Sequence, residues 1–440
     1  MDNKLLKILG VGFGVAVTLG GTIGTGILRK PGPIAAELGD PGLIMLVWVL
    51  VSIYALIGTI CTVELGTMLP RAGGWYVFTQ RAFGDYPGFV VGINSWLGTC
   101  SALGFGGYTL AEYTALLFPV LEGVEYWFAL CIIALLAGFH WLGLGWASSL
   151  QNVMSLIKGG GLLIFILACF FYGEPVGLEK TNEVTATVLG HGKWIAPLLF
   201  SLQAVFYTFD GWHSAAYFSE EDRNPSRNLP KSMIGGVLLI IIIYLLTNWA
   251  ILYVLPMETL QQSKLAAADA IAVVFGAGAG KWVTVFLIIS ILGIVNAQLL
   301  FNPRVIFSMS RDGLFFRGGD QVNKKGTPAM AMPLTALMAM LFILSGRETS
   351  EKLSDIATFF FVLGYVSGFA SLIMLRRKEP GLPRPWRTPL YPYLPAAMLL
   401  VSVVFLIIAA YQDTGASLYA IGFLALSYPV YRMIIWLNRR

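Results

Sequence analysis

Residues 19–28 read LGGTIGTGIL, and this stretch decides how the rest of the chain can be interpreted. It ends the uncharged run 8–28, whose 21 residues are long enough to cross a hydrocarbon core as a helix. Four glycines, however, lie within the seven positions from Gly20 to Gly26. Each glycine inside a helix costs roughly 0.5–1 kcal/mol relative to alanine. The run therefore predicts either a helix that is broken within the membrane or a close crossing of two helices.

A break in this segment would create a polar site inside the membrane. Unwound backbone in lipid is tolerated only where protein buries it or where it lines a watery cavity. The second half-helix would offer free N–H groups and the positive end of its dipole. Both features suit a carboxylate, so the stretch indicates an anion site at mid-membrane depth.

The composition is that of a polytopic membrane protein. Of the 440 residues, 57% are hydrophobic and 12% are charged, and the mean hydropathy is +0.73. The four cysteines lie inside apolar runs and the three histidines lie far apart, so we expect no disulfide framework and no metal site. We expect no cofactor either, because the chain has no phosphate-binding loop and no nucleophile motif. The expected partner is the lipid bilayer and not a nucleic acid.

Twelve apolar segments are candidate spans of a single transmembrane domain, residues 1–440. They lie near residues 8–28, 42–64, 87–111, 126–141, 146–172, 194–217, 232–256, 282–303, 328–345, 356–375, 393–411 and 416–435. An even number of spans places both termini on one side. With a cytoplasmic amino terminus, 20 Lys and Arg side chains lie inside, 8 lie outside and one lies within a span. The positive-inside rule therefore predicts a protein of the cell membrane with two cytoplasmic termini.

The sixth span carries a second interruption at Asp210 and Gly211. A charge at the centre of a membrane helix costs roughly 2.5–3.5 kcal/mol, so we expect Asp210 to face a cavity or a partner. The two interrupted spans lie five spans apart. Because five is odd, two repeats near residues 8–172 and 194–375 would be inverted relative to each other, with 389–437 outside the repeat.

Four stretches in order resemble the amino acid–polyamine–organocation superfamily. They are GTIGTGIL at 21–28, ELGTMLPRAGGWYVFTQRAFG at 64–84, FDGWHSAAYFSEEDRNPSRNLPKSM at 209–233 and FNPRVIFSMSRDGLF at 301–315. The second is similar to the L-amino-acid transporter branch. The resemblance implies the all-α leucine-transporter-type fold, with 12 transmembrane helices, a five-plus-five inverted repeat and breaks in helices 1 and 6. It also implies alternating-access transport of amino acids.

The resemblance implies that helix 1 binds the main-chain groups of the substrate. The carboxylate would meet the N–H groups of Thr25, Gly26 and Ile27, and the ammonium would meet the carbonyl of Thr22. N–H groups suit a carboxylate and exposed carbonyls suit an ammonium. Thr22 departs from the family pattern, because a branched apolar residue is common at its position.

On helix 6 the resemblance implies two further contacts. The backbone carbonyls of Tyr207 and Asp210 would also face the ammonium, and the Tyr207 ring would gate the site. The position of Asp210 is small or apolar in some members of the family. Its carboxylate would either add a preference for cationic substrates or cap the broken helix.

Lys158 lies near the middle of the fifth span, too deep to reach an interface easily. One interpretation is a lysine that faces a watery vestibule without a specific role. The resemblance implies another, in which a helix 5 ammonium that follows Gln151 and Asn152 replaces the sodium ion of sodium-coupled relatives. It would lie beside helix 1 carbonyls, with Asn296 and Gln298 as polar neighbours, and would act as a fixed cation or a proton carrier.

Other polar and aromatic residues have simpler interpretations. We expect Glu64 to be an interfacial charge beside Arg71, and His213 to be a packed side chain. Trp75 and Tyr76 are interpreted as ordinary interfacial aromatics.

The function that we expect is secondary transport of L-amino acids, most of all neutral ones, and not catalysis. The short TIGTG turn opposite Tyr207 leaves a modest pocket in which only Asp210 is acidic. The carrier would be sodium-independent and would work by exchange or with protons. The alternatives are a carrier of cationic amino acids or polyamines with the same fold, and a sensor subunit that does not transport. Whether an accessory subunit or an oligomer is involved is left open.

Overall fold

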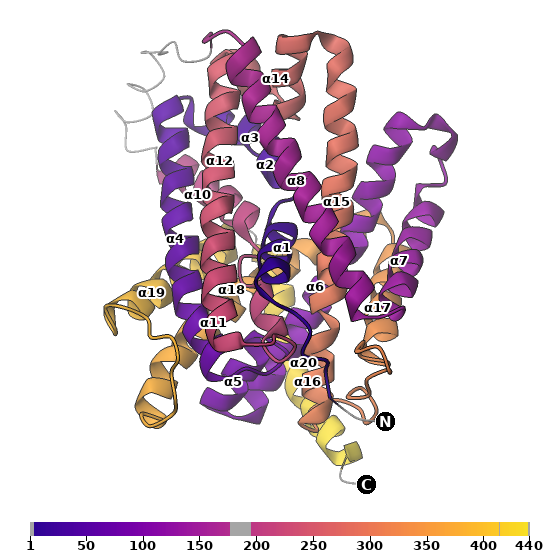
Figure 1. Ribbon diagram of the computed structural model, residues 1–440, viewed down its shortest axis with the longest axis vertical. Helices are drawn as coiled ribbons and strands as arrows, with labels where there is room; N and C mark the ends of the chain where they lie inside the picture. The colour runs from indigo at the N-terminus through magenta and orange to yellow at the C-terminus, as the bar shows by residue number, and fades with distance from the viewer. Residues whose placement is uncertain (1–3, 177–194, 413, 439–440) are drawn as a thin grey trace.

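The computed structural model describes residues 4–176, 195–412 and 414–438, and in these residues the protein is built of helices joined by turns and by two longer segments, 312–330 and 379–392. Most of the helices run along the long axis of the molecule, and α1, Val11–Thr22, lies in the middle (Figure 1). Both ends of the chain lie at the same end of the molecule (Figure 1), which we call the terminal end.

Eight helices among the described residues are long and apolar enough to cross a bilayer. They are α4, Pro41–Met68; α6, Asp85–Leu117; α8, Leu144–Tyr172; α11 to α12, Pro225–Val254; α15 and α16, Gly280–Arg311; the second part of α18, Phe359–Lys378, where α18 is Arg347–Lys378; α19, Tyr393–Gln412; and α20, Thr414–Asn438. This supports a polytopic membrane protein.

The four remaining expected spans are shorter or interrupted helices. They correspond to α1 followed by α2, Gly26–Arg29, and α3, Pro31–Leu38; α7, Glu125–Trp141; α10, Ile195–Phe209, followed by a 3₁₀ turn at Ser214–Phe218; and α17, Ala331–Leu344. Breaks in the first and sixth spans are therefore confirmed, while twelve spans and an inverted repeat remain predictions.

The local sequence explains how the long helices begin and how they tolerate polar residues. Before α4, the Asp40 side chain accepts a hydrogen bond from the N–H of Leu43 at 2.8 Å, and Pro41 takes the first helical position. Inside α4, the hydroxyls of Thr59 and Thr62 donate to carbonyls four residues earlier, at 2.7 and 2.9 Å. These bonds satisfy polar groups that have no access to water.

Three helices, α8, α12 (Gly235–Val254) and α15 (Gly280–Phe301), surround α1 and fix its position. The rings of Trp48, Phe209 and Tyr244 contact one another and join α4, α10 and α12. The two broken helices are thus embedded in the protein interior, where unwound backbone is permitted in a membrane.

Backbone and side-chain bonds tie the segments together at the terminal end. Leu9, just before α1, donates its N–H to the Glu221 carbonyl at 3.0 Å and accepts from the N–H of Arg223 at 3.1 Å. The Glu221 side chain forms a fully buried ion pair with Arg304 of α16, Pro303–Arg311, at 2.9 Å. Loss of one partner of such a pair would leave a buried charge uncompensated.

A second pair at this end joins Glu220 to Arg311 at 2.7 Å. Burial raises the pKa of the Glu220 carboxyl, but hydrogen bonds from Arg311 and from the N–H of Ala72 outweigh that effect. The pKa therefore lies below its ordinary value, and the carboxylate stays ionised and paired.

Candidate functional site

The break in α1 leaves backbone groups exposed inside the protein. Helix α1 ends at Thr22, Ile23 is extended with φ −72° and ψ 108°, and α2 starts at Gly26. The last carbonyls of a helix and its first N–H groups have no partner within the helix. The carbonyls that end α1 and the N–H groups that begin α2 therefore lie within a few residues of each other.

Lys158 of α8 lies at the carbonyl side of this break. Its Nζ donates to the carbonyl of Gly20 at 2.9 Å and to that of Ile23 at 2.8 Å, and its side chain is fully buried. From α15, the Ser290 hydroxyl reaches the same Ile23 carbonyl at 3.4 Å. A Cβ at Gly293 would lie 2.5 Å from Lys158 Cε, so glycine makes room for the lysine. Lys158 is therefore buried beside helix 1 carbonyls and does not face an open vestibule.

The contacts given for Asn296 and Gln298 are with groups other than the lysine. Asn296 Nδ2 donates to Gln151 Oε1 at 2.6 Å, and its Oδ1 lies 2.7 Å from His140 Nε2. Gln298 lies in the wall of a central cavity, with its Oε1 buried and without a hydrogen-bond partner. On α15, Ser290 shares the Ile23 carbonyl with the lysine and Gly293 lies against its side chain. The sequence did not single these residues out, because serine and glycine are common in membrane helices.

The break in the sixth span follows α10, and the conformation of its own backbone produces it. After α10 ends at Phe209, Gly211 adopts φ +107°, a conformation that favours glycine. The hydroxyl of Ser214 donates to the Gly211 carbonyl at 2.6 Å. A Cβ at Gly211 would lie 2.4 Å from the carbonyl oxygen of Gly21, so the two breaks approach backbone to backbone.

Tyr244 of α12 connects the two breaks. Its buried hydroxyl lies 3.0 Å from the carbonyl of Thr22 and 3.1 Å from that of Thr208. The sequence analysis missed this residue. The signal was present, since Tyr244 carries a lone hydroxyl inside the apolar run IIIIYLL.

A cavity of about 30 Å³ lies beside the breaks, large enough for about one water molecule. Its walls come from α1, α6, α15, α18 and the segment after α10, together with Trp75. The residues are Gly21, Ser95, Thr99, Asp210, Gly211, His213, Tyr217, Gln298, Phe301, Phe360, Phe361 and Gly364. Of the expected substrate-binding residues, only Asp210 lies in this wall, together with the neighbouring Gly211 and Gly21.

Asp210 faces both this cavity and polar partners, as expected. Its carboxylate accepts a hydrogen bond from the Tyr365 hydroxyl and lies 3.5 Å from His213 Nε2. The Asp210 side chain is 30% exposed, so the carboxylate is available to a bound molecule. His213 is a packed side chain, since its ring contacts those of Trp75, Trp212 and Tyr217.

The interpretation of Trp75 and Tyr76 as interfacial aromatics is wrong. Both side chains are buried, and Trp75 begins α5, Trp75–Phe83. The Trp75 ring packs edge-on against Tyr365 at 5.7 Å, and the Tyr76 hydroxyl donates to Asp312 at 2.9 Å. The turn at Gly73 and Gly74, both with positive φ, directs the chain inward at this point.

The other residues expected to bind substrate lie around the two breaks and are partly or fully buried. Tyr207 is half-buried, its carbonyl accepts from the N–H of Asp210 at 3.2 Å, and its hydroxyl receives Gln203 Nε2 at 3.3 Å. Gly26 packs against Thr208, because a Cβ there would lie 2.7 Å from Thr208 Oγ1. Ile27 is fully buried, and the Thr22 hydroxyl has no hydrogen-bond partner.

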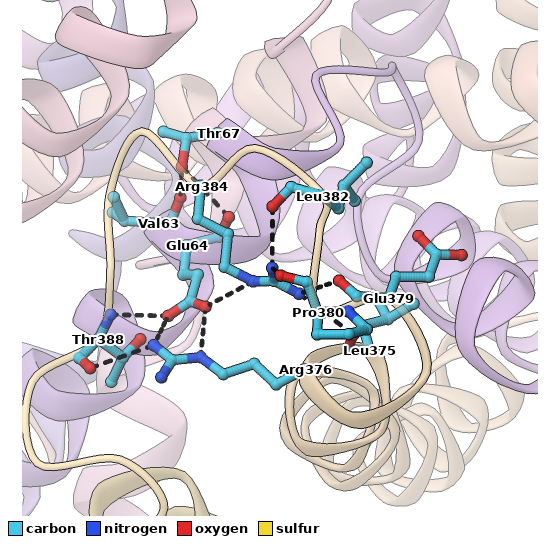
Figure 2. A network of polar contacts seen from close by, with 10 residues as sticks. All are labelled: Val63, Glu64, Thr67, Leu375, Arg376, Glu379, Pro380, Leu382, Arg384 and Thr388. Carbon is cyan, nitrogen blue, oxygen red and sulfur yellow. Dashed lines mark hydrogen bonds and ion pairs between the residues drawn. The ribbon is translucent and has the colours of Figure 1, made fainter.

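The expectation that Glu64 is an interfacial charge beside Arg71 is also wrong. Figure 2 shows the buried Glu64 carboxylate between two guanidinium groups, those of Arg376 at 2.6 Å and Arg384 at 3.5 Å. The N–H of Thr388 donates to the same carboxylate at 2.6 Å. Arg71 pairs instead with Asp312 at 2.6 Å. Glu64 therefore joins α4 to α18 and to the turn before α19.

A second cavity of about 510 Å³ lies at the carboxyl end of α6. Three carboxylates, those of Glu112, Glu122 and Glu125, line it together with the guanidinium of Arg29. Carboxylates outnumber the cation in this wall, so the cavity favours positively charged solutes.

The chain is similar in sequence to known amino acid transporters. The chain is 29% identical to the serine/threonine exchanger SteT of Bacillus subtilis over 401 residues, which cover 90% of this chain and 89% of SteT. It is 28% identical to the mouse b(0,+)-type amino acid transporter 1 over 423 residues, 92% of this chain and 83% of that protein. It is 27% identical to the mouse large neutral amino acids transporter small subunit 2 over 459 residues, 99% of this chain and 82% of that protein.

The amino acid permease family matches residues 14–428. This match extends over nearly the whole chain and includes both broken helices. The protein therefore belongs to the amino acid permease family, a family of membrane transporters rather than enzymes within the amino acid–polyamine–organocation superfamily.

Proposed function

We propose that this permease carries L-amino acids, neutral ones most of all, by alternating access and without sodium. The observation that carries the proposal is the Lys158 ammonium, which donates to the carbonyls of Gly20 and Ile23. Because a cation already lies at the carbonyls that end α1, a sodium ion there would be repelled. The names of two relatives, a serine/threonine exchanger and a large neutral amino acids transporter, support neutral substrates, and the first supports exchange. Coupling to protons is the other possible mode.

The substrate carboxylate would bind at the first turn of α2. The N–H groups of Thr25, Gly26 and Ile27 lie at the start of this helix, where no carbonyl of the same helix can accept from them. The backbone stays helical through Lys30 into α3, so the peptide dipoles of both segments add at this end.

The substrate ammonium would bind at the carbonyls of Thr22 and Tyr207 and at the carboxylate of Asp210. Both carbonyls already accept one hydrogen bond, from Tyr244 and from the N–H of Asp210. A carbonyl oxygen has two lone pairs and can accept a second bond. Because Tyr207 lies one turn before Gly211, its ring would move with the break and gate the site.

An amino acid does not fit a cavity of about 30 Å³, so binding requires the walls to separate. The moving parts would be the two broken helices, which meet each other directly at Gly21 and Gly211. Movement of this kind is what alternating access requires.

One specific observation favours a carrier of cationic amino acids or polyamines as the second candidate. Asp210 presents a carboxylate to the central cavity, and three further carboxylates line the cavity at the end of α6. A substrate with a second positive charge would gain from both. Competition by arginine, lysine and putrescine against a neutral amino acid would separate the two candidates.

The protein would lie in the cell membrane with both termini in the cytoplasm. The support is the distribution of Lys and Arg, 20 on the terminal side of the predicted topology and 8 on the other. An accessory subunit is left open.

The test is uptake of a panel of radiolabelled amino acids into proteoliposomes, empty or preloaded, with and without sodium and a proton gradient. We expect neutral amino acids to enter preloaded vesicles faster than empty ones, at equal rates in sodium and choline. A purified, folded protein that moves none of the panel under any condition would favour the third candidate, a sensor subunit.

A further inference from the structure

A line of buried polar side chains leads from α7 to α1 without touching the central cavity. His140 Nε2 lies 2.7 Å from Asn296 Oδ1, and Asn296 Nδ2 donates to Gln151 Oε1 at 2.6 Å. Gln151 Nε2 lies 3.3 Å from the carbonyl of Ala16, and the hydroxyl of Ser155 donates to that carbonyl at 2.6 Å. Four helices, α7, α15, α8 and α1, are thus connected by side-chain bonds.

All four of these polar side chains are buried: His140 and Asn296 are 1% and 0% exposed, and Gln151 and Ser155 are 0% and 2% exposed. An apolar side chain at any of these positions would avoid the free-energy cost of removing a polar group from water. A fully connected polar network fixes one arrangement of the helices that carry it.

The carbonyl of Ala16 determines which group donates and which accepts in each hydrogen bond of the line. A carbonyl only accepts, so the Gln151 amide must turn its NH₂ group toward α1 and its oxygen toward Asn296. Asn296 then turns its NH₂ group toward Gln151 and its oxygen toward His140. The proton on the imidazole therefore lies on Nε2, and His140 is the donor that begins the line.

The line ends at Ala16, nearly two helical turns before α1 ends at Thr22. Gln151, Ser155 and Lys158 lie at positions i, i+4 and i+7 of α8, on one face of the helix. Their partners Ala16, Gly20 and Ile23 have the same spacing along the chain.

Gly20 allows this close approach. A Cβ at Gly20 would lie 1.7 Å from Gln151 Nε2, so only glycine lets the amide lie against α1. The position of the Gln151 amide thus determines how α8 presents Lys158 to the break. Figure 1 shows α8 crossing beside α1 and α15 at this level.

We propose that His140 is a positioning residue for transport. Its Nε2–H orients Asn296, Asn296 orients Gln151, and Gln151 with Ser155 holds α1 where Lys158 can bind the carbonyls of the break. The inference rests on the proposed transport function. At its other end the line is anchored to the turn before α17, since the hydroxyl of Thr327 donates to the His140 carbonyl at 3.0 Å.

The test compares His140→Phe, which keeps the ring volume and removes the donor, with His140→Gln, whose amide N–H lies near the position of Nε2–H. We expect His140→Phe to lower the maximal exchange rate about tenfold, the effect of losing one buried hydrogen bond, with a KM within about twofold of wild type. His140→Gln should restore most of the rate. Thr59→Ala removes a buried hydroxyl that donates only within its own helix, and should transport like wild type.

A double-mutant cycle distinguishes positioning from a general packing role. If His140 acts through Gln151, His140→Phe in a Gln151→Leu background should cause no further loss of rate. Equal losses in His140→Phe and His140→Gln, or losses that multiply in the double variant, would overturn the proposal.

The same cycle measured by thermal unfolding keeps this inference separate from the proposed function. If wild type transports no amino acid, the proposed function fails, but the unfolding temperatures still report on the line. Additive changes of unfolding temperature for His140→Phe and Gln151→Leu would then refute the connection, and non-additive changes would support it.

Discussion

The two broken helices are stabilised by different means. At α1 the groups that satisfy the broken backbone come from other helices, namely Lys158 of α8 and Ser290 of α15. At the break after α10 they are mainly local, since Gly211 adopts φ +107° and Ser214 donates to the Gly211 carbonyl, while the Tyr244 hydroxyl is shared by the two breaks. The first break thus depends on a charge supplied over a sequence distance of more than a hundred residues, and the second on backbone conformation.

The comparison explains why an amino acid would use the two breaks differently. A break that is satisfied from outside keeps its own N–H groups, those at the start of α2, available for a ligand. At the break after α10, some backbone groups already bond to each other, since the N–H of Asp210 donates to the carbonyl of Tyr207. The side chain of Asp210 is then what the second break offers to the cavity.

Removing the Lys158 ammonium should have the largest effect on transport. Lys158→Ala removes the lysine donor from the Gly20 carbonyl and leaves the Ile23 carbonyl with the longer Ser290 contact, at roughly 1–3 kcal/mol for an unsatisfied group. We therefore expect amino acid exchange in proteoliposomes to fall at least about a hundredfold. The matched control is Lys281→Ala, which removes an exposed lysine of α15 and should exchange at the wild-type rate. Normal exchange by Lys158→Ala would show that the break of α1 does not need the lysine.

Changing the local backbone should have the next largest effect. In Gly211→Ala the left-handed conformation costs roughly 1–2 kcal/mol, and the new Cβ would lie 2.4 Å from the Gly21 carbonyl oxygen. We expect exchange to fall about tenfold or more, together with a lower unfolding temperature.

Gly84→Ala is the control for Gly211→Ala. Gly84 also has positive φ, +96°, but no atom lies within 4 Å of its ideal Cβ position. It carries the conformational cost without the contact between the breaks. If both variants lose the same amount of transport, the contact between Gly21 and Gly211 has no special importance.

Both breaks could be predicted from the sequence because their signals are local. Repeated glycines and an Asp-Gly pair inside apolar runs are unusual, and a buried charge such as Lys158 stands out in the same way. Helix positions could also be predicted, since long apolar runs have few alternatives.

The partners of polar residues could not be predicted in this way. Asn296 bonds to Gln151 and His140, and Glu64 to Arg376, because of how each helix is rotated about its axis. Hydrophobic periodicity does not specify that rotation when a membrane helix is apolar on every face. The inward position of Trp75 depends on the turn at Gly73 and Gly74, whose direction the sequence does not encode by itself.

A smaller effect on transport is expected from changing the Asp210 side chain at the second break. In Asp210→Asn the amide oxygen still accepts from the Tyr365 hydroxyl, so the aromatic wall should stay in place. We expect neutral amino acid exchange to fall less than about threefold, because a neutral substrate loses only one of its ammonium contacts. Competition by arginine and lysine, if wild type shows it, should disappear. A loss of neutral exchange as large as that of Lys158→Ala would mean that Asp210 is essential to the break itself.

The smallest effect on transport is expected when sodium in the solution is replaced by choline. The Lys158 ammonium binds the carbonyls of Gly20 and Ile23, and under the proposed function it takes the place of a sodium ion there. A second cation about 4 Å away would be repelled by about 4 kcal/mol at an effective dielectric constant of about 20. Replacing sodium with choline should therefore change the rate of wild-type exchange by less than about twofold. Uptake that needs an inward sodium gradient would place the coupling ion away from the break of α1. The two breaks would then differ in backbone conformation only, and not in how they bind cations.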